Sequence, residues 1–445
     1  MAEGPSRKFI TSVEVEDLFG QYSYVLSPRA DASSLADLLI FYGQNGAGKT
    51  TILSLLNHIL SKEPKAGHRT FIARTLFRRF AVNLSDGTAL VASREEARTG
   101  NFRLDVIRGT ESFYFDYEVN SDGAIPVATS DLSANVEFTK NLPDIHVAML
   151  AEDRKITNAT ISSKSAISSE QQHLIRALQK SQEEEKNPSA LTPALDGLRD
   201  WARSRAFQAN RIGQRDANVI YTDLLKRVAQ SDEEQGQIAA VLERLLGQGK
   251  RSRALSRFGL MAPIDVKPMA EVISATDSTR WNIVAQVIKP FLDSNEAKFD
   301  ALDPLQSTLT TFVDKLNGSF FENKGVLFDL QRGLRIIADG RLLNPQVLSS
   351  GEKQLLVLFC NAAQMSSRPT IFLIDEPELS LNVSWQRHLI DALRELSSEN
   401  VQFVMATHSL ELLSRHRPNM AKLDNTRPKR MANSPTETSE VSDEG

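Results

Sequence analysis

The chain has 445 residues, of which 41% are hydrophobic and 24% are charged, and its formal net charge at pH 7 is −4. This length and hydrophobic content allow a substantial core divided among two or three structural parts. A charge so close to neutral argues neither for nor against nucleic acid, so any nucleic-acid surface must be a local patch. The single cysteine, Cys360, excludes a disulfide framework within one chain, and its apolar surroundings predict a small buried side chain.

Targeting and membrane segments are not evident in the sequence. The N-terminal stretch MAEGPSRKFITSVEVEDLF lacks the apolar core of a signal peptide. No run approaches the roughly 18 consecutive apolar residues of a membrane span. We therefore expect a cytoplasmic protein without a membrane partner.

The first part of the chain, residues 1–155, has the pattern of a strand-rich half domain. KFITSVEVEDL and QYSYVL alternate apolar and polar residues as strands do. Farther along, TFIARTLFRRFAVNL, TALVAS, NFRLDVIRG and ESFYFDYEV are β-branched or aromatic runs separated by Gly, Asp and Ser. These later runs predict antiparallel strands.

Between the two groups of strands lies GQNGAGKT, which matches the phosphate-loop pattern G-x-x-x-x-G-K-[ST]. An apolar run precedes it and TTILSLLNHIL, with leucines at helical spacing, follows it, which is the strand–loop–helix context that such a loop requires. Its backbone N–H groups and the helix N-terminus can bind phosphate oxygens, while Lys49 reaches the β- and γ-phosphates and Thr50 ligates magnesium. The alternative is a glycine-rich turn without a ligand. The predicted nucleotide-binding residues here are Gly43, Gln44, Asn45, Gly46, Ala47, Gly48, Lys49, Thr50 and Thr51.

Residues 156–318 predict a helical insertion. EQQHLIRALQKSQEEEK, YTDLLKRVAQ, QIAAVLERLLGQ and WNIVAQVIKPFL all have helical spacing. No heptad pattern is sustained for many turns, and several prolines interrupt the segment, so we do not expect a long coiled-coil arm. These prolines are Pro188, Pro193, Pro263, Pro268, Pro290 and Pro304.

The strand pattern returns in residues 319–414, which begin with SFFENKGVLFDLQRGLRIIADGRLLNP and predict a second α/β half. Residues 415–445 are poor in large apolar side chains and rich in Pro, Ser, Thr, Asn and charge. This composition predicts a disordered polar tail.

A triphosphate site also needs an acidic residue at the end of a buried strand to hold magnesium. PTIFLIDEPELSL supplies an apolar strand with Asp375 and Glu376 at its tip. Asp375 can face the metal while Glu376 acts as the general base for the attacking water. Burial of Glu376 beside Pro377 favours a raised pKa. The alternative is that these carboxylates cap a helix.

Two further elements are ordinary when each is taken alone. LSSGEKQLLVLFCNAA places Ser349 and Ser350 at the start of a helix as a capping motif. VQFVMATHSLELL is an apolar strand that ends near His408. A lone histidine after a strand is more often a satisfied polar residue than a catalytic one.

Taken together in this order, the four elements GQNGAGKT, LSSGEKQ, IFLIDEPELSL and ATHS resemble the Walker A, signature, Walker B plus D-loop, and switch-histidine motifs of ABC-type ATPases. More narrowly, they resemble the SMC, RecF and OLD branch, in which the signature is often LSSGE and the acidic motif continues as DEPE. The resemblance covers roughly residues 8–155 and 319–412. It implies an α/β fold: an ABC-type head with a mixed sheet around the phosphate loop plus an antiparallel β part, and an inserted helical domain.

The resemblance also implies an ATP-sandwich homodimer or a higher homo-oligomer. ATP and Mg²⁺ would lie between the Gly43 loop of one copy and the signature segment of the other, which comprises Ser349, Ser350, Gly351 and Glu352. It assigns catalytic roles to Lys49, Glu376 and His408, magnesium ligation to Thr50 and Asp375, and an interface loop to Ser380 and Asn382.

Two departures from the transporter pattern bear on this assignment. Ser350 and Glu352 differ from the commonest transporter signature, which argues against a transporter partner. The Q-loop is not identified by motif, and Glu152, Asp153 and Gln208 are the candidates for it.

Two basic stretches of the helical insertion are candidates for phosphate contacts with nucleic acid. A solvated helix face is the commoner explanation for such runs, because acidic runs lie nearby. Nucleic acid therefore stays open as a partner. The residues are Arg199, Arg203, Arg205, Arg211 and Arg215 in the first stretch and Lys250, Arg251, Arg253 and Arg257 in the second.

Three functions from different classes follow. The first is the sensor or regulatory ATPase of a bacterial anti-phage system, resembling the ATPase subunits of Septu, PARIS or retron-type modules, whose ATP-driven dimerisation controls a separately encoded nuclease or toxin effector. The second is a RecF-type ATPase that binds DNA during repair. The third is an assembly scaffold cemented by ATP, which Glu376 disfavours because a scaffold needs no general base.

Overall fold

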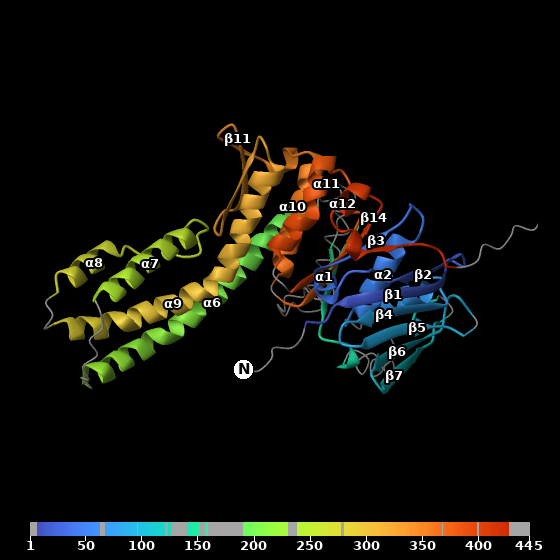
Figure 1. Ribbon diagram of the computed structural model, residues 1–445, viewed down its shortest axis with the longest axis horizontal. Coiled ribbons are helices and arrows are strands. Elements are labelled where there is room, and N and C mark those ends of the chain that lie inside the picture. The colour runs from blue at the N-terminus through green and yellow to red at the C-terminus, as the bar shows by residue number, and fades with distance from the viewer. Residues whose placement is uncertain are drawn as a thin grey trace, which may run out of the picture.

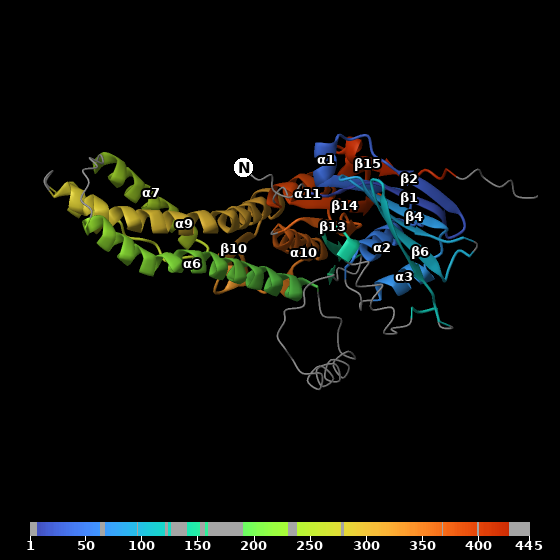
Figure 2. The same ribbon diagram turned by 90° about the horizontal axis from the view of Figure 1, so that it is seen from below.

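The computed structural model describes residues 7–62, 67–95, 97–120, 123–125, 140–151, 156–158, 190–229, 238–276, 280–366, 368–397 and 400–426. These residues form a head that contains two large sheets, and a helical arm that projects from one side of it (Figures 1 and 2). The Q-loop candidates Glu152 and Asp153 lie outside the described residues, as does the predicted tail from residue 427 onward.

A mainly parallel sheet lies at the centre of the head. Within the described residues its strand order is β15-β3-β14-β13-β8-β9, and every pairing is parallel except β8 with β9. Successive residues of its strands alternate between two hydrophobic cores, so both faces are buried and the strands read as continuous apolar runs. The strands are β3 (Leu38–Tyr42), β8 (His146–Leu150), β9 (Ile156–Asn158), β13 (Thr370–Asp375), β14 (Val401–Thr407) and β15 (Met420–Lys422).

An antiparallel sheet covers one side of this central layer. Its strand order among the described residues is β2-β1-β4-β5-β6-β7, which confirms antiparallel strands after the phosphate loop. The prediction was wrong for TFIAR, the first part of the earliest run, because these residues form the end of helix α3 (His68–Arg74). The inner side chains of this sheet share a core with helix α2 (Lys49–Leu60) and with alternate residues of the central strands. The strands are β1 (Ile10–Leu18), β2 (Tyr22–Leu26), β4 (Arg79–Leu84), β5 (Thr88–Ser93), β6 (Phe102–Arg108) and β7 (Glu111–Tyr117).

Helices cover the opposite side of the central sheet. Helices α10 (Ser350–Met365) and α11 (Val383–Leu396) pack there and share the second core with strands β13 and β14. The predicted α/β class, with a mixed sheet beside an antiparallel part, is therefore confirmed. Among the described residues, the head also contains the short helices α1 (Ala32–Asp37), α3 (His68–Arg74) and α12 (Leu410–Leu413).

The helical arm is built on two long helices that lie side by side, α6 (Leu191–Ala229) and α9 (Trp281–Lys315) (Figures 1 and 2). The prediction that prolines interrupt this segment was wrong for α9, because Pro290 and Pro304 both lie inside it. Each internal proline costs about 3 kcal/mol. Burial of the side chains Phe299, Leu302, Leu305, Leu309 and Phe312 along one stripe of α9 offsets that cost.

The far end of the arm has a small core of its own. Helices α7 (Ile238–Ser256) and α8 (Lys267–Ser274) fold back on α9, and Leu245, Trp281 and Leu292 are buried between them. Two arginines of α7 add ion pairs, since Arg251 bonds two carboxylates of α9 and Arg244 bonds two others. The second basic stretch therefore helps to hold α7 against α9.

A five-residue π-helix, Leu316–Phe320, ends α9 and leads back into the head. It is followed by a small antiparallel sheet of β10 (Gly325–Asp329), β11 (Gly333–Ala338) and β12 (Arg341–Leu343). The first half of α6 packs along α10. Among the described residues, none of the helices is both long enough and apolar enough to span a bilayer.

The prediction of disorder from residue 415 onward was wrong for the first residues of that segment. Strand β15 pairs in parallel with β3. The side chain of Asn419, just before β15, donates to the carbonyl of Leu38 at 2.9 Å. The backbone N–H of Leu423 donates to the carbonyl of Tyr42 at 2.9 Å. This segment therefore supports the strand that leads into the glycine loop.

Candidate functional site

The glycine loop runs from the end of β3 to the first turn of α2, and two of its glycines need their backbone freedom. Gly46 and Gly48 have φ angles of 79° and 87°, in the left-handed region that L side chains avoid. A Cβ atom on Gly48 would lie 2.7 Å from Cδ2 of Leu18. The Tyr24 hydroxyl donates to the Ala47 carbonyl at 3.1 Å, a support from the antiparallel sheet that the motif did not predict. The loop is thus a preformed cradle for an anion at a helix N-terminus.

Lys49 is the first residue of α2 and its side chain is only 5% exposed. Its Nζ donates to the carbonyls of Gly43 at 3.0 Å and Gln44 at 3.2 Å. The same ammonium lies 3.2 Å from Oε1 of Glu376. This buried cation therefore joins the glycine loop to the acidic strand end.

The acidic pair stands at the carboxyl end of β13. Asp375 is fully buried. The next residue, Glu376, has a φ of 45° and its N–H donates to the carbonyl of Ala406 at 2.9 Å. A left-handed backbone at a residue other than glycine is strained, and such strain is concentrated at functional sites. The turn directs the Glu376 side chain toward Lys49 and away from the strand.

The second carboxylate oxygen of Glu376 faces the histidine at the end of β14. Nδ1 of His408 lies 2.5 Å from Oε2 of Glu376, and the His408 side chain is 47% exposed. Burial acts to raise the pKa of Glu376. The hydrogen bond from Glu378, the charge of Lys49 and the bond with His408 outweigh it and lower that pKa. The expectation of a raised pKa for Glu376 was therefore wrong.

Glu378 lies beside Glu376 and His408 and forms a cluster with them. No role was predicted for it from the sequence. It is only 5% exposed, and burial raises its pKa, with the nearby charge of Glu376 adding to the effect. Its Oε1 accepts hydrogen bonds from the Thr407 hydroxyl and from the N–H groups of His408 and Ser409, the latter two at 3.1 Å each. The only sequence signal for it is the second glutamate of DEPE.

A cavity of about 430 Å³ brings the loop and this cluster together. Asp375 does not line it, because that carboxylate is buried behind the strand end. Thr50 is exposed and lines the cavity. The hydroxyl of Thr50 and the carboxylate of Asp375 are oxygen ligands of the kind that Mg²⁺ prefers. The lining residues are Phe19, Asn45, Gly46, Gly48, Lys49, Thr50, Thr51, Glu376, Leu379 and His408.

The signature segment lies apart from this cavity. Ser349 caps α10 in a capping box, in which its Oγ accepts from the N–H of Glu352 and Glu352 Oε2 accepts from the N–H of Ser349. Ser349 and Ser350 are exposed, whereas Gly351 is buried. A Cβ atom on Gly351 would lie 2.4 Å from the carbonyl oxygen of Ser380, so only glycine fits there. None of the four predicted signature residues lines the 430 Å³ cavity.

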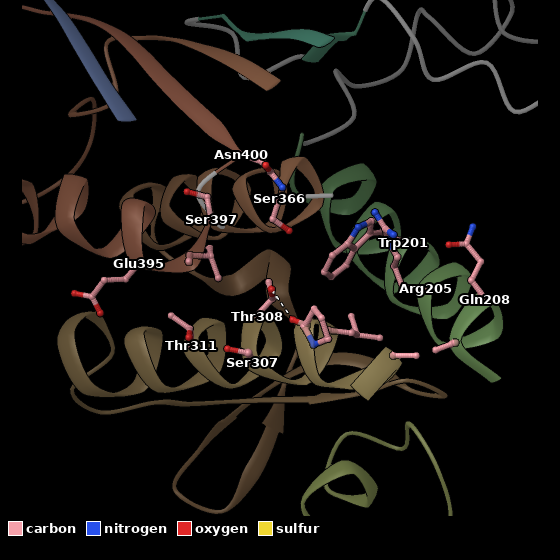
Figure 3. A pocket seen from close by; sticks show the side chains of 15 residues that line it. Trp201, Arg205, Gln208, Ser307, Thr308, Thr311, Ser366, Glu395, Ser397 and Asn400 are labelled. Carbon is pink, nitrogen blue, oxygen red and sulfur yellow. Dashed lines mark hydrogen bonds between the residues drawn. The ribbon is translucent and has the colours of Figure 1, made fainter. Parts of the chain in front are cut away.

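A larger cavity, of about 520 Å³, lies where the arm meets the head (Figure 3). Trp201, Arg205 and Gln208 reach it from α6, and Thr308 reaches it from α9. It contains none of the predicted nucleotide-binding or catalytic residues. Gln208 is exposed here and does not line the glycine-loop cavity, so the structure gives it no place in that site.

Comparisons with known proteins identify a family and several partial relatives. Residues 38–414 match the family described as "AAA domain, putative AbiEii toxin, Type IV TA system". The chain is 26% identical over 193 residues to the "Uncharacterized ABC transporter ATP-binding protein YejF" of Escherichia coli K12, covering 41% of this chain and 36% of that protein. It is 28% identical over 175 residues to the "Retron Ec83 probable ATPase" of Escherichia coli, covering 33% of this chain and 32% of that protein. The chain thus spans about a third of the length of these relatives.

Among solved structures, the Smc head domain of Pyrococcus furiosus, with an extended coiled coil and bound to the C-terminal domain of ScpA, aligns with this chain. The alignment covers 92% of this chain and 91% of that chain, with 14% sequence identity and a TM-score of 0.37.

Replacing the buried ammonium is the first test of the cavity. We expect Lys49→Ala to weaken ATP binding by about 10- to 100-fold, because a charged hydrogen-bond donor to phosphate is lost. The measurement is titration with a fluorescent ATP analogue, and a thermal melt verifies that the variant is folded. Lys250→Ala, at an exposed lysine of α7, is the matched control. Wild-type affinity in Lys49→Ala would refute the site.

Proposed function

The chain belongs to the family described as "AAA domain, putative AbiEii toxin, Type IV TA system", and we propose that it is an ATP-hydrolysing switch that regulates a bacterial anti-phage effector. The observation that carries the hydrolytic part is the linked set of Lys49, Glu376 and His408 in front of the glycine loop. A positive charge, a carboxylate of lowered pKa and an imidazole converge there on one cavity.

Each residue of the cavity has a distinct proposed role. The loop N–H groups and Lys49 bind the phosphates. Thr50 and Asp375 would hold Mg²⁺, which would supply charge neutralisation at the phosphates. Glu376 is already ionised and accepts a proton as the water oxygen bonds to the γ-phosphorus and the bond to the ADP oxygen breaks. His408 contacts the γ-phosphate and keeps Glu376 oriented.

The placement of the signature segment supports a two-chain site. Ser349 and Ser350 are exposed at the N-terminus of α10, apart from the glycine loop of the same chain. A helix N-terminus attracts an anion. We therefore propose that the segment Ser349–Glu352 of one copy closes over the triphosphate bound to the loop of another, giving a homodimer or a higher homo-oligomer.

The link to defence rests on the comparisons and on the packing of the arm. One relative is a retron ATPase by name, and the family description names a toxin. Helix α10, which begins at the signature segment, packs along α6 of the arm. Closure of the dimer can therefore reach the arm, where we place the contact with a separately encoded nuclease or toxin. We place this assembly in the cytoplasm.

The RecF-type alternative has weaker support in this chain. Four arginines of the two basic stretches are engaged within the fold: Arg203 donates to two backbone carbonyls, and Arg199, Arg251 and Arg257 lie beside carboxylates. Fewer arginine side chains are therefore available to contact nucleic acid than the sequence indicated. The scaffold alternative does not explain the Glu376–His408 contact, because a protein that only binds ATP needs no general base.

Removing the charge of the proposed base separates binding from turnover. We expect Glu376→Gln to bind ATP and to hydrolyse it about 10²- to 10⁴-fold more slowly, since a general base contributes that factor. ATP-bound closed dimers should then accumulate. Steady-state ATPase assays and light scattering with and without ATP measure the two effects. Unchanged turnover would contradict the assignment of the base.

Mixing two inactive variants tests whether the site is shared. We expect Lys49→Ala and Ser350→Arg each to lose ATPase activity, one through the loop and the other through the exposed signature face. In a mixed dimer, one of the two sites combines an intact loop with an intact signature, so an equal mixture should recover at most about a quarter of wild-type activity. Recovery no greater than the sum of the separate variants would argue against a two-chain site.

Purification together with the product of the neighbouring gene tests the regulatory role. We expect a stable complex in which nuclease or toxin activity depends on the nucleotide state, with Glu376→Gln and Lys49→Ala giving opposite outputs because one is trapped with ATP and the other lacks it. ATPase activity with and without duplex DNA is measured on the same sample. Strong DNA stimulation without a co-purifying partner would favour the repair alternative.

A further inference from the structure

We propose that Glu378 is a positioning residue for hydrolysis, which holds the segment Thr407–Ser409 so that His408 meets Glu376. This inference rests on the proposed ATPase function and deepens it. The four catalytic motifs of the sequence assign no role to this glutamate, which follows Pro377 in the turn after β13.

The contacts of Glu378 converge on one short stretch of backbone. A single carboxyl oxygen, Oε1, accepts from the Thr407 hydroxyl and from the N–H groups of His408 and Ser409. The hydroxyl of Thr407 in turn accepts from the N–H of Ser409 at 2.9 Å. Strand β14 ends at these residues, and helix α12 begins just after them. Glu378 therefore accepts hydrogen bonds from polar groups that would otherwise lack an acceptor at the end of the strand.

The turn that carries Glu378 is itself braced. Gln354 of α10 donates to the carbonyl of Pro377 at 3.3 Å, and the N–H of Leu381 donates to the carbonyl of Glu378 at 3.0 Å. The glutamate is therefore fixed from the β13 side and bonded to the β14 side. Glu378 therefore links the end of β13, which carries Glu376, to the end of β14, which carries His408.

The consequence is a fixed geometry for the proposed base and the switch histidine. Their side chains approach to 2.5 Å, and Nδ1 of His408 lies 3.4 Å from Oε1 of Glu378. Because the His408 side chain is 47% exposed, packing alone does not hold it. Backbone bonds from Glu378 supply the constraint, and a misplacement of about 1 Å in a catalytic group costs on the order of 10²-fold in rate.

The bonds made by Glu378 require an acceptor oxygen at this position, because Oε1 accepts all three of them. An amide oxygen in its place can accept the same three bonds. Glutamine is therefore a functional substitute at Glu378 and a destructive one at Glu376.

The test compares an acceptor with a non-acceptor at the same position. We expect Glu378→Leu to bind ATP with unchanged KM and to lower kcat on the order of 10²-fold, and Glu378→Gln to restore kcat to within a few-fold of wild type. Steady-state ATPase kinetics on the full chain measure both parameters, and thermal melts compare the stability of the two variants. Wild-type kcat in Glu378→Leu would overturn the proposal, as would an equal loss in both variants.

A second pair of variants keeps the test valid when Glu378→Leu does not fold. Thr407→Val removes one donor to Glu378 without changing the shape of the side chain, whereas Thr407→Ser retains the hydroxyl. We expect the valine variant to lower kcat more than the serine variant, at equal KM. Equal kcat values for the two would overturn the proposal. Absence of ATPase activity in the wild-type chain would instead refute the proposed function itself, which distinguishes the two failures.

Discussion

The ion pair between the buried Lys49 and Glu376 is the interaction on which the rest of the site depends. An ammonium that is 5% exposed must have its charge compensated, and two loop carbonyls and one carboxylate do so. The loop can offer those carbonyls because Gly46 and Gly48 adopt left-handed backbone angles, and Glu376 can reach the ammonium because its own backbone is turned in the same way. The left-handed backbone at these three residues thus allows one contact to join the two segments.

This contact is possible because of the order of the strands. Strands β3, β14 and β13 are adjacent and parallel, so the segments that follow them emerge at one edge of the sheet. Three segments that are far apart in sequence meet there: the glycine loop, the turn with Glu376 after β13, and the segment with His408 after β14. The antiparallel sheet and α10 bury the two faces of this layer and hold the edge in place.

Much of this arrangement is predictable from the sequence, because strand, loop and helix patterns are local. The glycine loop and the capping box of Ser349 lie where their motifs indicate. The lowered pKa of Glu376 was not predictable, because the sequence indicates an apolar neighbourhood for the carboxyl but not that Lys49 and His408 face it. Pro290 and Pro304 misled because packing of α9 along α6 outweighs a local propensity, and β15 was missed because three residues carry too little pattern.

Because α6 is long, a small tilt near the head produces a larger displacement at the far end of the arm. The N-terminal half of α6 lies along α10, the helix whose first residues we propose to contact a second copy of the chain, while the rest extends beyond the head (Figure 2). With 39 residues, α6 is about 58 Å long, so a tilt of about 5° that it shares with α10 displaces its far end by about 5 Å. Near the sheet, such a tilt is too small to disturb the packing. At the end of the arm, the displacement is comparable to the rise of one helical turn.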